Sequence, residues 1–166
     1  MIASNAARIV LDDLEFRLVC PITLDTDQGG EIVEYCPSSR YKNTGNLPLH
    51  EFGKEPFCHF KIPSDPLTKT IGIYALVEVG GQVKYIGETG DSLVDRFNGG
   101  YGRISPRNPF KGGQQTNCHI NKRLLESAKS GRSIELWFHP TDVPKGERKA
   151  NEKRLIRSLR PPWNLE

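Results

Sequence analysis

The strongest constraint on the fold is a hairpin pattern between Ile71 and Gly87. Apolar residues alternate along the chain from Ile71 to Val79, and because successive side chains of a strand point to opposite faces of a sheet, this alternation predicts a strand. Gly80-Gly81 then predicts a two-residue turn, since glycine adopts positive φ without strain. With that turn, Val79 pairs with Gln82 and the returning strand runs through Gly87.

This register puts two tyrosines on one face of the predicted hairpin. Tyr74 pairs with Gly87. Tyr85 pairs with Leu76, which makes the two tyrosine side chains diagonal neighbours about 7 to 8 Å apart at the backbone. Because glycine has no side chain, Gly87 is expected to leave an unfilled space opposite Tyr74. Lys84 alternates to the opposite face and is therefore not nominated for the same chemistry.

The residues after the hairpin predict helices and one further strand, and therefore an α+β fold. Helix starts are indicated by capping residues and helix ends by glycine or by the residue before a proline. The expected elements are a helix from Asp91 or Ser92 through Asn98, a helix from Thr116 or Asn117 that stops at Gly131, a strand on which Ile134, Leu136 and Phe138 alternate, and a helix from about Gly146 to Leu159. The 166 residues suit one compact domain with a small appendage.

The first part of the chain is rich in turn formers, and only short apolar runs lie between them. The segments Phe16–Ile22, Glu31–Tyr35 and Phe57–Ile62 are predicted strands, which we expect to form a small sheet packed on the rest. The sequence therefore predicts a β- and loop-rich N-terminal extension over residues 1–66 and a main domain over residues 67–166.

The charge is distributed unevenly along the chain. Residues 1–80 carry 7 basic and 11 acidic side chains, whereas residues 81–166 carry 16 basic and 9 acidic ones. Because Arg and Lys displace counterions from phosphates, a polyanionic partner is expected to meet the second half, although ordinary solvated helix faces are the alternative. The basic loop and helix from Gly102 to Arg123 are predicted to lie on DNA, with phosphate contacts from Arg103, Arg107, Lys111, Lys122 and Arg123.

Other patterns limit the location of the protein and the chemistry of its cysteines. No run of about 18 apolar residues occurs and the N-terminus lacks a signal-peptide pattern, so a cytoplasmic protein without a membrane partner is expected. The four cysteines are far apart, which favours free thiols. A zinc cluster of Cys36, His50, Cys58 and His59 is an alternative, although the spacing matches no structural zinc pattern.

A carboxylate is expected on the inward side of the last helix. Glu152 precedes Leu155 by three residues and Ile156 by four, so helical geometry places it on the apolar stripe. Burying an unpaired carboxylate costs free energy, and Glu152 should therefore meet a cation, either a basic side chain or a metal ion.

Taken in order, these residues resemble the GIY-YIG nuclease family over roughly residues 70–166. The matching elements are Gly72-Ile73-Tyr74, Tyr85-Ile86-Gly87, Arg96 eleven residues after Tyr85, Glu152, and Asn164 within Pro161-Pro162-Trp163-Asn164. The resemblance implies a small three-stranded antiparallel sheet flanked by helices. It also implies hydrolysis of phosphodiester bonds with one bound Mg²⁺ or Mn²⁺.

One position departs from the family pattern. The family commonly has a tyrosine or histidine four residues after the arginine, but Gly100 stands there and Tyr101 follows it. The segment Asn98-Gly99-Gly100 could absorb this offset of one residue, which makes Tyr101 the preferred candidate. His119 is the alternative, and it is expected on the surface or facing DNA.

The resemblance also implies a role for each candidate. Tyr74 would be the general base, Tyr85 and Tyr101 would position the water or phosphate, and Arg96 would hold the phosphate. Glu152 would bind the metal ion, and Asn164 would steady the glutamate or the chain end. Because the ordinary pKa of tyrosine is about 10, the phenolate needs a stabilising neighbour. Glu88 is a further possible ligand, although a carboxylate in this turn is expected to be solvated.

Within the nuclease class, an enzyme of restriction type that cuts double-stranded DNA is expected, because the chain is short and carries no recognisable separate targeting domain. Restriction enzymes of this family often pair protomers, so a homodimer is possible. Three alternatives stay open: a repair or mobile-element nuclease of the same family, a catalytically inactive DNA-binding module, and a zinc-stabilised interaction domain.

Overall fold

The computed structural model describes residues 7–41 and 47–165, and the chain divides into two compact units. The first unit consists of Met1–Pro21, Pro63–Val94 and Ser133–Glu166, and the second of Ile22–Ile62 and Asp95–Arg132. Each unit is built from segments that are far apart in the sequence. Residues from before position 66 and from after it occur in both units.

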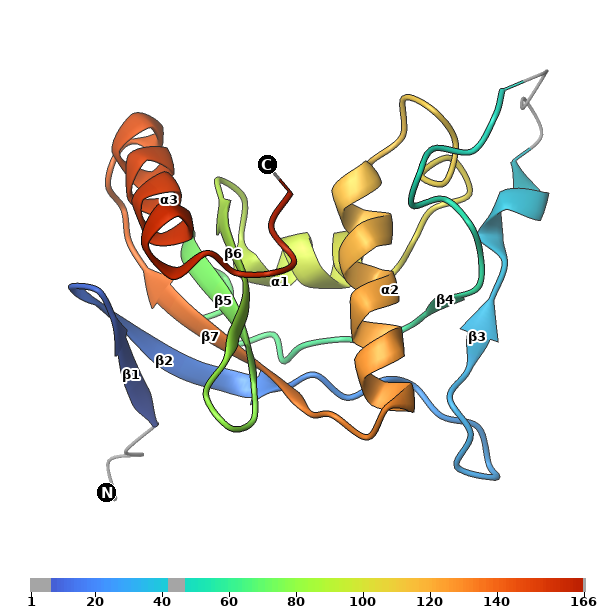
Figure 1. Ribbon diagram of the computed structural model, residues 1–166, viewed down its shortest axis with the longest axis horizontal. Helices are drawn as coiled ribbons and strands as arrows, with labels where there is room; N and C mark the ends of the chain where they lie inside the picture. The colour runs from blue at the N-terminus through green and yellow to red at the C-terminus, as the bar shows by residue number, and fades with distance from the viewer. Residues whose placement is uncertain (1–6, 42–46, 166) are drawn as a thin grey trace. The chain divides into compact units, whose positions relative to one another are not determined.

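The first unit contains an antiparallel sheet with the strand order β1-β2-β7-β5-β6 (Figure 1). The strands are β1 (Arg8–Leu11), β2 (Leu14–Pro21), β5 (Gly72–Glu78), β6 (Val83–Thr89) and β7 (Ile134–Pro140). The protein is therefore an α+β fold, as predicted, but the sheet has five strands where the family resemblance implies three. The three expected strands lie together as β7-β5-β6, and β2 pairs with the other side of β7. Residues 8–21 thus extend this sheet and do not form a separate one.

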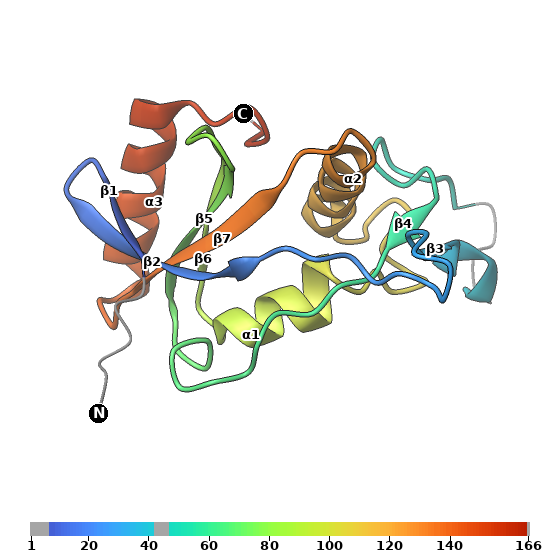
Figure 2. The ribbon, with the colours of Figure 1, turned by 90° about the horizontal axis from the view of Figure 1, so that it is seen from below.

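One face of this sheet is closed by helix α3 (Lys145–Leu159), as Figure 2 shows. Leu155 of α3 packs with the β5 residues Ile73, Ala75 and Val77, which all point to the same face because they alternate along the strand. Burying an aliphatic side chain of this size contributes about 1.5 to 3 kcal/mol. The helix is therefore held mainly by this apolar face.

The hairpin of β5 and β6 has the predicted register at its tyrosine end and a different one at its turn. Tyr74 pairs with Gly87, and Leu76 pairs with Tyr85, so both pairings are confirmed. Beyond a β-bulge, however, the next pair is Val77 with Val83, and the Glu78 N–H donates to the Gln82 carbonyl at 2.8 Å. The predicted pairing of Val79 with Gln82 is therefore wrong, because β6 holds one extra residue, Lys84, near the turn.

The second unit has little regular β-structure. The strands β3 (Glu34–Tyr35) and β4 (Phe57–Cys58) form a two-stranded sheet, and a short 3₁₀ helix, η1 (Pro37–Arg40), follows β3. Both strands are shorter than predicted. A small core of Phe57, Ile104 and Cys118 links β4 to the loop after residue 101 and to helix α2.

The helices agree with the predicted positions to within a few residues. Helix α2 covers Gln115–Lys129, whereas α1 (Leu93–Arg96) is short and continues into a π-helical turn, η2 (Phe97–Tyr101). Among the described residues, we find no helix whose length and apolar character would let it cross a bilayer.

Candidate active site

Tyr74 and Tyr85 lie side by side on the sheet face opposite α3. Their side chains are buried, with 1% and 9% exposure, and their ring centroids are 6.2 Å apart. The Tyr74 ring lies over Gly87, because a Cβ atom built on Gly87 would lie only 2.4 Å from the Tyr74 hydroxyl oxygen. The space predicted to stay empty is therefore filled by Tyr74 itself. A glycine is required at position 87 for this ring position.

The outer edge of β6 is covered by groups from the C-terminal part of the chain. β6 is the last strand in the sheet, so its outward backbone groups need partners from elsewhere. The Asn164 amide donates to the Ile86 carbonyl at 2.8 Å and accepts from the Ile86 N–H at 2.9 Å. The Trp163 N–H donates to the Lys84 carbonyl at 2.9 Å. Asn164 therefore fixes the chain end to β6, which is one of the two roles that the resemblance implies.

Glu152 meets the same strand one step further along. This residue of α3 is half-buried, and it lies close enough to Glu88 for the backbone and the charge of Glu88 to act on its pKa. Burial raises the pKa of Glu152, and the negative charge of Glu88 raises it further, while Lys149 and Lys153 act in the opposite direction. Both main causes disfavour the ionised form, so a cation at this place would be stabilising.

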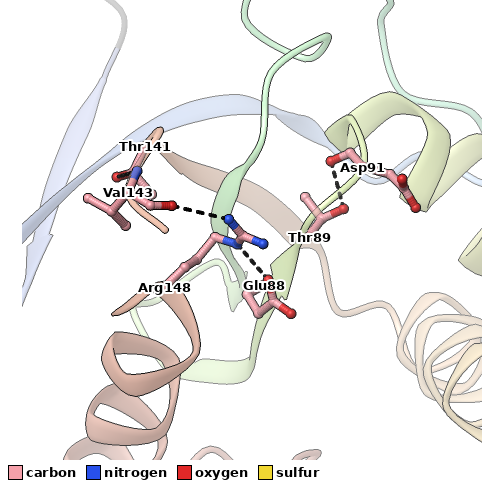
Figure 3. Close-up of polar contacts among 6 residues, drawn as sticks. All are labelled: Glu88, Thr89, Asp91, Thr141, Val143 and Arg148. Atoms are coloured by element: carbon pink, nitrogen blue, oxygen red, sulfur yellow. Dashed lines mark hydrogen bonds and ion pairs between the residues drawn. The ribbon is translucent and has the colours of Figure 1, made fainter. Parts of the chain in front are cut away.

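A buried ion pair joins Arg148 of α3 to Glu88 of β6 (Figure 3). The Arg148 Nε atom donates to Glu88 Oε2 at 2.6 Å, and the two side chains are only 4% and 14% exposed. A second nitrogen of Arg148 donates to the Val143 carbonyl at 3.4 Å. The expectation that Glu88 is solvated is therefore wrong. Sequence reasoning missed Arg148, although its position four residues before Glu152 places both on one helix face.

The bulge in β6 changes the position of Lys84. Its side chain is buried, and its Nζ atom donates to Gln82 at 2.6 Å and lies 3.8 Å from a carboxylate oxygen of Glu78. Glu78 shares a sheet face with Tyr74, because the two residues are an even number of positions apart on β5. The prediction that Lys84 faces away from the tyrosines is thus wrong, and the extra residue at the bulge is the cause.

In the second unit, the structure brings Arg96 and Tyr101 together. The Arg96 Nη2 atom donates to the Tyr101 hydroxyl at 2.9 Å, and the guanidinium carbon lies 4.5 Å from the centre of the ring. The π-helical turn closes with a hydrogen bond from the Gly102 N–H to the Phe97 carbonyl at 2.8 Å. Such a turn holds one residue more than an α-helical turn. It therefore brings Tyr101 against Arg96, five residues before it.

His119 is not on the surface, contrary to expectation. It is 3% exposed, and its ring lies 4.5 Å from that of Phe52, because this side of α2 packs against the unit's core. On the same helix, the side chain of Asn121 is buried and bonds to the backbone of Cys58 and to the Tyr101 carbonyl at 2.8 Å. Sequence reasoning also missed Asn121, which ties the Tyr101 backbone to β4.

The five predicted phosphate contacts differ in their surroundings. Arg103 and Lys111 are exposed. Arg107 donates to two backbone carbonyl oxygens of its own loop, at 3.3 and 2.9 Å. Lys122 donates to a backbone carbonyl, and Arg123 pairs at 3.5 Å with a glutamate three residues further along α2. Three of the five cations therefore have partners within the chain.

The zinc cluster of Cys36, His50, Cys58 and His59 does not form. Both ring nitrogens of His50 are occupied, at 2.6 Å from a backbone carbonyl oxygen and at 3.0 Å from a backbone nitrogen. The Cys58 thiol donates a hydrogen bond to the Asn121 side chain of α2, and the His59 ring stacks on Tyr35. Within residues 7–41 and 47–165, no three His, Cys, Asp or Glu side chains lie close enough to hold a metal ion.

The candidates therefore fall into two sets, each within one unit. Tyr74, Tyr85, Glu152 and Asn164 gather around β6 in the first unit, and Arg96 contacts Tyr101 in the second. Comparisons with family models, with curated proteins and with solved structures found no match to this chain.

Proposed function

We propose that the protein is a Mg²⁺- or Mn²⁺-dependent endonuclease that hydrolyses phosphodiester bonds in double-stranded DNA, most simply of restriction type. One observation carries the proposal. The Tyr74 phenol lies against β6 at Gly87, and the Glu152 carboxylate lies close enough to the next residue, Glu88, for that residue to act on its pKa. Neighbouring residues of a strand are only about 3.3 Å apart, so the proposed base and the proposed metal ligand meet the same short stretch of β6.

The donor set suits a hard divalent cation. Mg²⁺ is usually bound through one or two carboxylates together with phosphate oxygens and water. Glu152 would hold the ion, and Glu88 is the second carboxylate beside it, fixed by Arg148. Burial raises the pKa of Glu152, and the negative charge of Glu88 raises it further; a bound cation would favour the ionised carboxylate against both effects. When bound, the ion would supply charge stabilisation for the phosphate and the leaving oxygen.

The side chains then divide the remaining work. Tyr74 would accept the proton of the attacking water, and Tyr85, with its ring centroid 6.2 Å away, would orient that water. Arg96, in the second unit, would bind a phosphate of the DNA, since a guanidinium binds two phosphate oxygens at once. The Tyr101 hydroxyl fixes the direction of the Arg96 side chain. Asn164 acts through the β6 backbone, so it is a positioning residue.

The main alternative is a DNA-binding module without catalysis, which the exposed Arg103 and Lys111 would serve equally well. A repair or mobile-element nuclease would use the same chemistry on other DNA. In the restriction-type enzyme that we propose, two protomers would pair to cut both strands.

Plasmid cleavage separates these functions. Purified protein should convert supercoiled plasmid to nicked or linear DNA with Mg²⁺ or Mn²⁺, and EDTA should stop the reaction. Glu152→Ala should keep DNA affinity and lose cleavage, whereas Glu147→Ala, which removes an exposed carboxylate of the same helix, should cut normally. Binding without any cleavage by the unmodified protein would favour the non-catalytic module.

A further inference from the structure

The second unit contains a cavity that the proposed nuclease chemistry does not use. Its volume is about 820 Å³, which is within the range of about 300 to 1,000 Å³ typical of small-molecule sites. Aromatic rings and cations both line it. The lining residues used below are Tyr35, His59, Asp25, Arg40, Lys61 and Arg103.

Two stacked rings form a rigid part of the wall. The rings of Tyr35 and His59 are almost parallel, at 13°, with centroids 3.7 Å apart. The Tyr35 hydroxyl accepts from the Ile104 N–H at 2.6 Å and lies 3.3 Å from the Ile104 carbonyl oxygen, to which it donates. The His59 carbonyl accepts from the Asp25 N–H at 2.8 Å. The Tyr35 ring is therefore fixed by its hydroxyl, and the His59 ring stacks on it, before any ligand arrives, which lowers the entropy lost on binding.

The same rings are uncharged near neutral pH. Burial raises the pKa of Tyr35 to about 12, and burial also lowers the pKa of His59. A neutral imidazole has one N–H donor and one acceptor nitrogen, so it can bond to the edge of a planar heterocycle. Aromatic side chains of this kind bind nucleobases by stacking, with little dependence on the sequence.

Cations surround this apolar wall. Arg40, Lys61 and Arg103 are exposed residues on the rim, and the charge of Arg103 acts on the pKa of both Tyr35 and His59. Arginine forks match phosphate oxygens in pairs. A ligand with a flat ring at one end and a phosphate at the other would therefore satisfy both parts of the cavity.

We propose that this cavity binds one nucleotide, with its base against the Tyr35–His59 pair and its phosphate on Arg40, Lys61 and Arg103. Its source is an unpaired nucleotide of the DNA on which the proposed endonuclease acts, and in this respect the inference rests on the proposed function. A base within a duplex is stacked on both sides, so only an extruded or unpaired base can enter such a cavity. This assigns a purpose to residues 22–62, which supply most of these side chains.

Fluorescence of 2-aminopurine tests the proposal with the full chain in EDTA, so that cleavage has no part in the signal. One probe is a duplex with a single unpaired 2-aminopurine, and the other is the free 2-aminopurine deoxynucleoside monophosphate. Both should be quenched on binding. His59→Ala and Arg103→Ala should each weaken binding of the unpaired-base duplex about tenfold. Lys69→Ala, which removes an exposed cation of the first unit, should leave it unchanged.

The outcomes are distinct from a failure of the nuclease proposal. Equal affinities of the unmodified chain, His59→Ala and Arg103→Ala would overturn the proposal, whether or not the protein cuts DNA. If the free monophosphate were quenched and the duplex were not, the claim that the bound nucleotide comes from DNA would be overturned. Because Arg103 is exposed, its variant should fold normally, and circular dichroism checks both variants. Tyr35→Phe keeps the aromatic ring, so binding to this variant should still quench the fluorescence. A Tyr35→Phe variant that no longer quenches the fluorescence would contradict a stacking role.

Discussion

Gly87→Ala is the perturbation for which the structure gives the clearest magnitude. The added methyl carbon would lie 2.4 Å from the Tyr74 hydroxyl oxygen, 2.5 Å from Cζ and 2.8 Å from Cε2, whereas ordinary contact begins at 3.4 Å. The ring must therefore move by about 1 Å, because Gly87 is fixed by its backbone pairing with Tyr74. Overpacking of a buried site costs about 1 to 3 kcal/mol.

Two consequences follow for Gly87→Ala. The melting temperature should fall by about 2 to 12 °C, since each kcal/mol corresponds to about 2 to 4 °C in a chain of this size. If Tyr74 is the general base, a displacement of about 1 Å should also slow plasmid cleavage about 100-fold. Thermal unfolding by circular dichroism and single-turnover cleavage with Mg²⁺ measure the two effects on the same preparation.

The controls use another glycine and a second mutation. Gly146→Ala adds a methyl group where no atom lies within 4 Å, so stability should be unchanged or slightly higher. In a Tyr74→Leu background, which lacks the ring, Gly87→Ala should cost much less than in the unmodified chain. Unchanged stability of the Gly87→Ala single variant would refute the ring position on which the site is built.

Three further predictions concern stability, and urea unfolding measures each of them. Arg148→Met leaves the buried Glu88 carboxylate without its ion pair and should cost about 3 to 5 kcal/mol. Asn164→Ala removes both hydrogen bonds to the β6 edge and should cost about 1 to 3 kcal/mol. Burial raises the pKa of Cys58 and Cys118 from 9.0 to about 12, so unfolded chains lose these protons first and stability should fall as pH rises from 9 toward 12.

Each of these predictions has a matched control. Arg157→Met removes an exposed arginine of α3, and a loss equal to that of Arg148→Met would contradict the importance of the buried pair. Asn151→Ala, on the same helix, should change stability less than Asn164→Ala does. Replacing Cys118 with alanine should reduce the loss of stability between pH 9 and 12. An unchanged pH dependence in that variant would rule out the thiol as its source.

The hairpin and its register at the tyrosine end could be predicted from the sequence, whereas the pairing at the turn could not. The alternation of β5 fixes which side chains share a face, and the paired glycines at Gly80 and Gly81 fix where the chain turns back. The bulge at Lys84 could not be predicted, because one extra residue does not produce a recognisable change in the sequence pattern of so short a strand. It is the reason that Lys84 contacts Glu78.

Local sequence patterns could not predict which strands pair or which side chains form the buried ion pair. The segment Phe16–Ile22 predicts a strand, but it does not show that this strand pairs with β7, and the strand β1 was not predicted. Arg148 resembles the exposed basic residues around it on α3, and its partner Glu88 is 60 residues away in the sequence. The sequence made Tyr101 a candidate beside the flexible segment Asn98-Gly99-Gly100, but it did not predict the hydrogen bond from Arg96 to Tyr101.

The most direct test of the central claim is the single-turnover rate of supercoiled plasmid cleavage for Glu152→Gln, measured with Mn²⁺ at saturating protein. Glutamine keeps the size of the side chain but removes the charge that would hold the metal ion. The proposed mechanism predicts a rate at least about 100-fold lower than that of the unmodified chain, with unchanged DNA affinity. Glu147→Gln, on the exposed first turn of the same helix, should cut at the normal rate. Cleavage by Glu152→Gln at the rate of the unmodified chain would contradict the assignment of this site.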